Sequence, residues 1–226
     1  KDSGIKLMFT IGLKEIYNKV FACLKGTGLE HIVVCALADA LPPFKSLLFR
    51  TLKFNLIAHV PNVKQTSTFE YFTSLGDDAK TAEVDPAKDI ALIQYTGGTT
   101  GVAKGAMLTH RNIISNMLQI FEWIKPKLIE GEEVALAPLP LYHVFSLTLN
   151  CMALFKFGAT NVLVTNPRDI PGFIKEMDKT PFTIFTGINT LLVALMNHPD
   201  FSKADLSQLK LSVAGGMALQ ASTAER

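Results

Sequence analysis

Short apolar runs alternate with amphipathic helical stripes along the whole chain, and this alternation limits the fold more than any other feature. Residues 5–9 and 31–35 are strand-like, and apolar side chains recur at helical spacing over residues 13–24 between them. A strand–helix–strand unit of this length places its two strands parallel, with a right-handed crossover. Further strands are expected at residues 134–137, 161–164, 182–185 and 209–213, with helices between them. We therefore predict an α/β fold of repeated strand–helix units with mainly parallel sheets.

The composition is that of a globular protein and excludes several classes of function. Of 226 residues, 48% are hydrophobic and 19% are charged. The formal net charge is only +2, so we expect no nucleic-acid partner. The three cysteines are widely spaced and form no Cys-x-x-Cys pair, which favours a reducing setting without disulfides or a zinc site. We predict a cytoplasmic location.

Two segments could contact a membrane. Residues 134–155 carry no Asp, Glu, Lys or Arg and have the length of a bilayer span, but Pro138 and Pro140 interrupt them. We interpret this segment as a strand, a loop and a buried helix. Residues 41–55 have the pattern of a basic amphipathic helix. We expect its apolar side to dock on the core, the alternative being an anionic membrane surface.

A glycine- and threonine-rich loop is the strongest candidate for a site. It follows residues 90–94, which we predict to be a buried strand, and it is closed by a lysine. Glycines allow close approach of the backbone to a ligand, and successive backbone N–H groups can hold an anion. Threonine hydroxyls and a lysine ammonium add donors for phosphate oxygens. The candidate nucleotide-binding residues are Tyr95, Thr96, Gly97, Gly98, Thr99, Thr100, Gly101, Val102, Ala103, Lys104, Gly105 and Ala106.

Neither of the two common phosphate-binding motifs describes this loop. A Walker A loop needs Gly before the lysine and Ser or Thr after it, whereas Lys104 lies between Ala103 and Gly105. A dinucleotide fingerprint opens a helix, whereas residues 105–108 resemble a short strand.

The loop instead resembles the nucleotide loop of the adenylate-forming, or AMP-binding, superfamily. Ala103 stands where most members have Pro, and Gly98 where many have Ser; both departures also occur in bacterial long-chain fatty acid–CoA ligases. Residues 138–143 resemble the family's Pro-Leu-aromatic-His segment. Gly215, Gly216 and Met217 resemble its Gly-Gly segment, with Ala218 replacing the usual Pro. The resemblance is specific over residues 89–219 and looser before them.

The resemblance implies a reaction in two steps. A long-chain fatty acid would attack ATP to form acyl-AMP, and the thiol of coenzyme A would then displace AMP, with Mg²⁺ on the phosphates. By resemblance, His143 is the candidate catalytic residue and lies near the carboxylate as a positioning group. Gly215, Gly216 and Met217 would pack on the adenine, and residues 186–190 would contribute to the wall of an acyl tunnel.

The resemblance also implies an incomplete domain. We expect residues 1–226 to be part of an N-terminal AMP-binding domain, with a first βαβ portion and connecting segment at 1–88 and an ATP-loop and acyl-pocket portion at 89–226. The family's later motifs and its C-terminal domain are absent, the chain starts without Met, and residues 221–226 resemble the beginning of a helix. We therefore expect a central piece of a longer ligase that is inactive by itself.

Two other functions remain open at this point. One is a non-catalytic homologue that binds nucleotide or acyl chains. The other is an adenylating enzyme for another carboxylic acid, although the apolar segment 144–155 favours a long acyl chain. A homodimer and peripheral contact with the inner face of the membrane are also left open.

Overall fold

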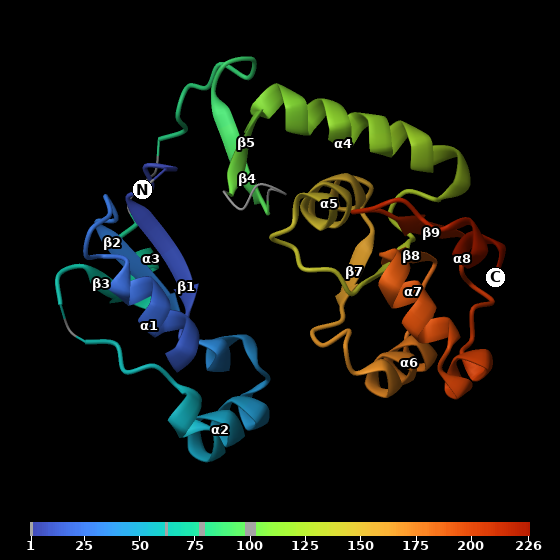
Figure 1. Cartoon of the computed structure of the whole chain (residues 1–226), viewed down its shortest axis with the longest axis horizontal. Helices are drawn as coiled ribbons and strands as arrows, with labels where there is room; N and C mark the ends of the chain where they lie inside the picture. The colour runs from blue at the N-terminus through green and yellow to red at the C-terminus, as the bar shows by residue number, and fades with distance from the viewer. Residues whose placement is uncertain (1, 62, 77–79, 98–102) are drawn as a thin grey trace. The chain divides into compact units, whose positions relative to one another are not determined.

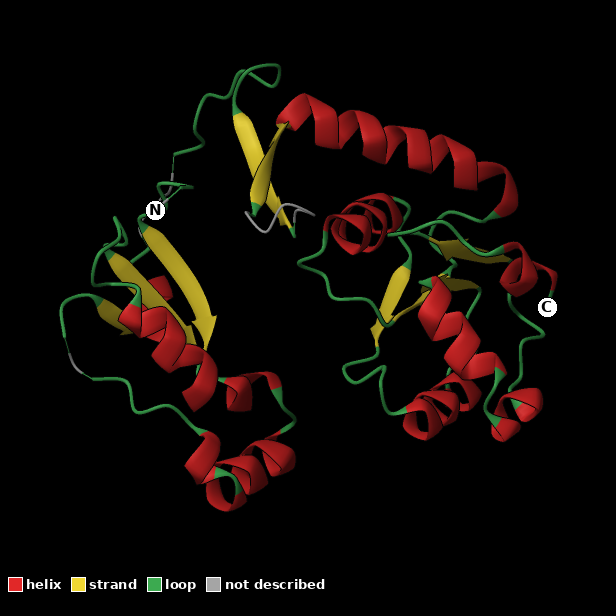
Figure 2. Cartoon of the chain, viewed as in Figure 1, coloured by secondary structure: helices red, strands yellow, loops and turns green. Residues whose placement is uncertain are grey.

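The computed structural model describes residues 2–61, 63–76, 80–97 and 103–226 (Figures 1 and 2). The chain divides into two compact units, Lys1–Glu83 and Val84–Arg226. Each contains parallel sheet covered by helices, so the predicted α/β class is confirmed. The functional boundary expected between residues 88 and 89 stays a prediction.

The first unit is built on a three-stranded parallel sheet in the order β1-β2-β3. The predicted strand–helix–strand unit is confirmed, because Leu7 of β1 pairs in parallel with His31 of β2. The buried Tyr17 of α1 packs with Ile32 on one face of the sheet. On the other face, Phe72 of α3 lies 5.7 Å from the Phe9 ring. The elements are β1 (Leu7–Ile11), α1 (Lys14–Ala22), β2 (His31–Cys35), β3 (Thr66–Thr68), which the sequence did not predict, and α3 (Phe69–Ser74).

Helix α2 (Pro43–Leu52) follows a short turn of helix, η1 (Leu37–Ala40), and precedes another, η2 (Phe54–Leu56). The helix was expected to dock by its apolar side, and this expectation is wrong: none of its residues is buried. Its half-buried residues are Ser46 and Phe49, and the Arg50 guanidinium donates to the Asp39 carboxylate of η1 at 2.6 Å. The helix is therefore held by the side opposite to its main apolar stripe.

The second unit begins with an antiparallel hairpin of β4 (Ile90–Thr96) and β5 (Lys104–Thr109). The prediction of a buried strand at 90–94 is wrong in one respect: the strand exists, but no residue of it is buried. Among the described residues, the strand pairs with β5 alone and belongs to no larger sheet, so it lacks the neighbours that bury the strands of the four-stranded sheet. Helix α4 (His110–Ile124) starts where β5 ends, and the side chains of Thr109 and Asn112 cap it reciprocally.

A four-stranded parallel sheet in the order β7-β6-β8-β9 forms the core of the second unit. Because side chains alternate along a strand, Ala135 packs with Leu149 on one face, while Leu136 packs with Phe173 on the other. Helix α4 and the π-helical segment η4 cover the first face, and α6 and α7 cover the second. The elements are η3 (Lys125–Lys127), β6 (Val134–Ala137), α5 (Val144–Ser146), η4 (Leu147–Leu154), β7 (Thr160–Leu163), α6 (Ile170–Lys179), β8 (Ile184–Gly187), α7 (Asn189–Met196), η5 (Pro199–Lys203), β9 (Leu211–Ala214) and α8 (Ala221–Glu225).

Residues 134–155 form the predicted strand, loop and helix, although most of the helix is π-helical. None of the helices in the described part of the chain is long and apolar enough to cross a bilayer.

A buried ion pair joins the amino ends of β6 and β9. The Glu133 side chain is fully buried and accepts from Lys210 Nζ at 2.8 Å and from the Ile129 N–H at 2.7 Å. Burial by itself raises the pKa of Glu133, but the hydrogen bonds from Ile129, Lys210 and Thr183 together hold it below the ordinary value. The pair lies at the edge of the sheet opposite to the loops described next, so we assign it to stability.

Candidate functional site

The hairpin of β4 and β5 brings the two ends of the glycine/threonine loop together. Thr96 pairs with Lys104, and Tyr95 pairs with Gly105. Lys104 is exposed and forms no ion pair with any described residue, so its ammonium group is available to an anion. Five of the predicted nucleotide-binding residues lie outside the described part of the chain: Gly98, Thr99, Thr100, Gly101 and Val102.

Gly105 has a packing role within the hairpin. A Cβ atom at this position would lie 2.7 Å from Ile93 Cγ2 and 3.2 Å from Tyr95 Cζ. Glycine therefore lets the side chains of Ile93 and Tyr95 on β4 lie across the backbone of β5. This close packing supports the pairing of Thr96 with Lys104 at the two ends of the loop.

His143 lies in the loop after β6 and caps the short helix α5. Its Nδ1 atom accepts a hydrogen bond from the Phe145 N–H at 3.3 Å. Because Nδ1 acts as acceptor, the proton of the neutral ring is on Nε2. The imidazole is exposed, so Nε2–H can donate to a ligand outside the loop.

The glycines after β9 lie against the segment that follows His143. A Cβ atom on Gly215 would be 2.5 Å from Phe145 Cε2, so the ring occupies the space of the missing side chain. Gly216 has a φ of +77°, a left-handed conformation that glycine adopts without strain. Met217 is exposed. The structure thus places Gly215 of the motif 215–217 against Phe145, two residues after the motif 138–143.

A cavity of about 490 Å³ adjoins this contact. Its walls come from α4, from α5 and η4, and from β9: Gln119, Ile120, Trp123, Ile124, Phe145, Leu149, Leu211, Ser212, Val213 and Ala214. The volume is in the range of small-molecule pockets, and most of the lining is apolar. Helix α4 begins at the hairpin and ends at this cavity, so it connects the loop with the pocket. Sequence reasoning missed the contribution of α4, because its pocket-lining residues look like ordinary helix surface.

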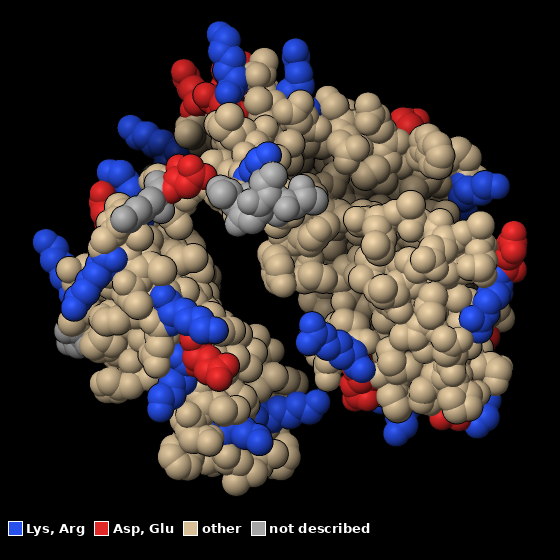
Figure 3. Space-filling view, in the orientation of Figure 1, with Lys and Arg blue, Asp and Glu red and all other residues tan. Residues whose placement is uncertain are grey.

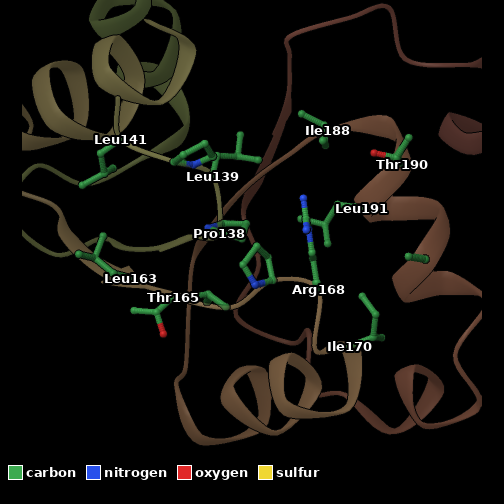
Figure 4. A pocket seen from close by; sticks show the side chains of 14 residues that line it. Pro138, Leu139, Leu141, Leu163, Thr165, Arg168, Ile170, Ile188, Thr190 and Leu191 are labelled. Atoms are coloured by element: carbon green, nitrogen blue, oxygen red, sulfur yellow. The ribbon is translucent and has the colours of Figure 1, made fainter. Parts of the chain in front are cut away.

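A larger cavity of about 780 Å³ lies at the carboxyl ends of β6, β7 and β8 (Figure 4). The strand order reverses between β6 and β8, which is where parallel α/β sheets leave a crevice. Figure 4 shows Arg168 pointing into this cavity, toward Ile188 and Leu191. Ile188 and Thr190, from the segment 186–190, line this cavity and not the smaller one.

Among the described residues, no group of three His, Cys, Asp or Glu side chains lies close enough together to hold a metal ion. The described loop residues offer hydroxyl groups, N–H groups and one ammonium. This donor set suits phosphate oxygens better than a bare divalent cation.

Comparisons with known proteins agree with one another. The family of AMP-binding enzymes matches residues 1–226. A long-chain fatty acid–CoA ligase of Salmonella typhimurium is 42% identical over 228 residues, which cover 100% of this chain and 40% of that protein. The corresponding protein of Haemophilus influenzae is 44% identical over 233 residues, with coverages of 100% and 41%. The chain therefore spans about 40% of the length of these relatives.

Solved structures show the same fold. The crystal structure of a long-chain fatty acid–CoA ligase from Archaeoglobus fulgidus superimposes with a TM-score of 0.69 at 22% identity, over 100% of this chain and 39% of that one.

Proposed function

Because this chain belongs to the family of AMP-binding enzymes, we propose that the protein containing it is a long-chain fatty acid–CoA ligase. The enzyme would join a fatty acid to ATP as acyl-AMP, with release of pyrophosphate, and then transfer the acyl group to the thiol of coenzyme A. The proposal rests chiefly on the match over residues 1–226, together with identities above 40% to ligases of this name. The Phe145–Gly215 contact beside an apolar cavity supports it.

The loop closed by Thr96 and Lys104 would hold the phosphates of ATP. As the fatty carboxylate attacks the α-phosphorus, negative charge shifts onto the departing pyrophosphate. The Lys104 ammonium and backbone N–H groups of the loop would stabilise that charge. Mg²⁺ bound together with ATP would supply further positive charge at this site. The residues of this chain would then position the nucleotide.

The fatty acid would lie with its carboxylate at His143 and its chain in the 490 Å³ cavity. His143 Nε2–H would donate to a carboxylate oxygen and orient it, while Gly215, Gly216 and Met217 would present backbone to the adenine. Ile188 and Thr190 line the larger cavity, so the tunnel-wall role of residues 186–190 would require the acyl chain to reach that cavity as well.

The same proposal includes the location of the protein. We infer a cytoplasmic enzyme in peripheral contact with the inner face of the membrane, because a long-chain fatty acid partitions into lipid. A homodimer stays open.

Palmitate-dependent exchange of pyrophosphate into ATP tests the proposal. We expect exchange by the protein expressed from its entire coding sequence, and none by the 226-residue chain alone. Lys104→Ala should lower the exchange rate, whereas the matched control Lys127→Ala, at another exposed lysine of the same unit, should not. Exchange that depends on a different carboxylic acid, and not on palmitate, would instead identify an adenylating enzyme for that acid. ATP binding without exchange for any acid would favour the non-catalytic homologue.

A further inference from the structure

Helix α2 and the turn after it carry an unusual number of large apolar side chains in water. The exposed fractions are 77% for Phe44, 63% for Leu47, 66% for Leu52 and 72% for Phe54, and Leu48 and Leu56 are also exposed. By contrast, helix α6 has the same length and buries Phe173, Ile174 and Met177. We call Phe44, Leu47, Leu48 and Leu52 the apolar face of α2.

The spacing of these four residues puts them on one side of the helix. Positions 44, 47, 48 and 52 are separated by three and four residues, the distances of neighbours on a helical surface. The opposite side holds the helix in place through Ser46 and Phe49, and through the Arg50–Asp39 ion pair. The apolar face therefore points outward although the helix is anchored to η1. Its exposure is a feature of the folded first unit.

Two lysines border this face. No Asp or Glu occurs in residues 40–69, and Asp39, just before them, is paired with Arg50, which leaves Lys45 and Lys53 without an ion pair among the described residues. Figure 3 shows basic side chains at the α2 end of the first unit, with acidic atoms (red) beside some of them. Lys45 and Lys53 also border a shallow hollow of about 240 Å³, whose other walls are Leu41, Leu48, Phe49 and Leu52.

We infer that the apolar face of α2 inserts into a membrane surface containing anionic lipid, with Lys45 and Lys53 at the level of the headgroups. This inference deepens the proposed function, on which it rests, by assigning the peripheral membrane contact to one surface. The charge pattern selects a lipid as the occupant: a helix with an apolar face flanked by cations is suited to the boundary between anionic headgroups and acyl chains.

Co-sedimentation with vesicles tests the inference on the protein expressed from its entire coding sequence. Vesicles of phosphatidylcholine alone are compared with vesicles that also contain phosphatidylglycerol, at low and high salt. We expect binding to the anionic vesicles, weakened by salt. The triple variant Phe44→Ser, Leu47→Ser, Leu52→Ser should need at least about tenfold more lipid for half-binding, because three apolar side chains no longer leave water.

Two further sets of variants keep the test specific. Lys45→Ala and Lys53→Ala should each weaken binding to anionic vesicles about fivefold and leave binding to neutral vesicles unchanged. The control variant Phe155→Ser removes an equally exposed apolar side chain from the second unit and should bind as the wild type does. Circular dichroism and gel filtration check that every variant is folded.

The outcomes separate this inference from the proposed function. If the triple variant binds vesicles as well as the wild type, or if the wild type does not bind because another part of the chain covers α2, the inference is wrong. Palmitate-dependent exchange is measured on the same preparations in detergent. Exchange that persists without vesicle binding leaves the proposed function intact. Vesicle binding without exchange would support the membrane inference and refute the proposed ligase function.

Discussion

Replacing Gly215 by alanine should damage fatty-acid activation through a ring on another element. The added Cβ atom would lie 2.5 Å from Phe145 Cε2, 2.6 Å from Cζ and 2.8 Å from Cδ2. Real Cβ atoms do not approach carbon this closely, so the ring must move. Gly215 has a φ outside the left-handed region, so the backbone itself tolerates alanine.

The distances give the size of the movement. Ordinary contact begins at about 3.4 Å, so the Phe145 ring must shift by about 0.9 Å. The ring lines the proposed acyl cavity and follows His143 by two residues, so a fatty carboxylate would be displaced from ATP by a similar distance. A misplacement of about 1 Å can cost up to about a hundredfold in rate. We expect kcat/KM for palmitate to fall between about tenfold and a hundredfold.

The assay is palmitate-dependent exchange of pyrophosphate into ATP by the protein expressed from its entire coding sequence. Gly28→Ala is the matched control, because a Cβ atom at Gly28 would meet nothing within 4 Å and its φ is not left-handed. The double variant Gly215→Ala, Phe145→Leu should recover part of the activity, since leucine lacks the ring atoms that collide. Unchanged kcat/KM in the single variant, or equal losses in both glycine variants, would refute the reasoning.

Three stability predictions are checked by thermal unfolding. Lys210→Met leaves the Glu133 carboxylate buried without its cation. It should lower the free energy of unfolding by about 2 kcal/mol at neutral pH, or the Tm by about 6 °C. This loss is smaller than for a fully buried pair because Lys210 is 38% exposed. The folded-state pKa of Glu133 is lowered, so the stability difference between the wild type and this variant is fully present above the ordinary pKa of a glutamate. It should vanish as the pH falls through the folded-state pKa. A stability difference that stays constant in acid would contradict this reasoning. Tyr17→Phe should change stability by less than about 0.5 kcal/mol, because the buried hydroxyl has no hydrogen-bond partner among the described residues. Thr109→Ala removes the cap of α4 and should cost about 1 kcal/mol, and no loss would argue against the reciprocal cap.

Local patterns were sufficient for most helices and strands. Strands β2 and β6 occupy the predicted residues. The predicted strands depend on the spacing of apolar side chains only a few residues apart, which a linear sequence records directly. Strand β3 was missed because three polar residues, Thr66–Thr68, have no apolar pattern, and only pairing with β2 makes them a strand.

The sequence by itself determined the α/β class, the family resemblance and the identity of the three motifs, because each is encoded in consecutive residues. Only the tertiary structure decided which motifs lie near each other. The contact of Phe145 with Gly215 joins residues far apart in the chain, and the cavity beside them needs α4 as a third wall. The tertiary structure likewise decided which side of α2 faces water, because a helical pattern shows that an apolar face exists but not what covers it.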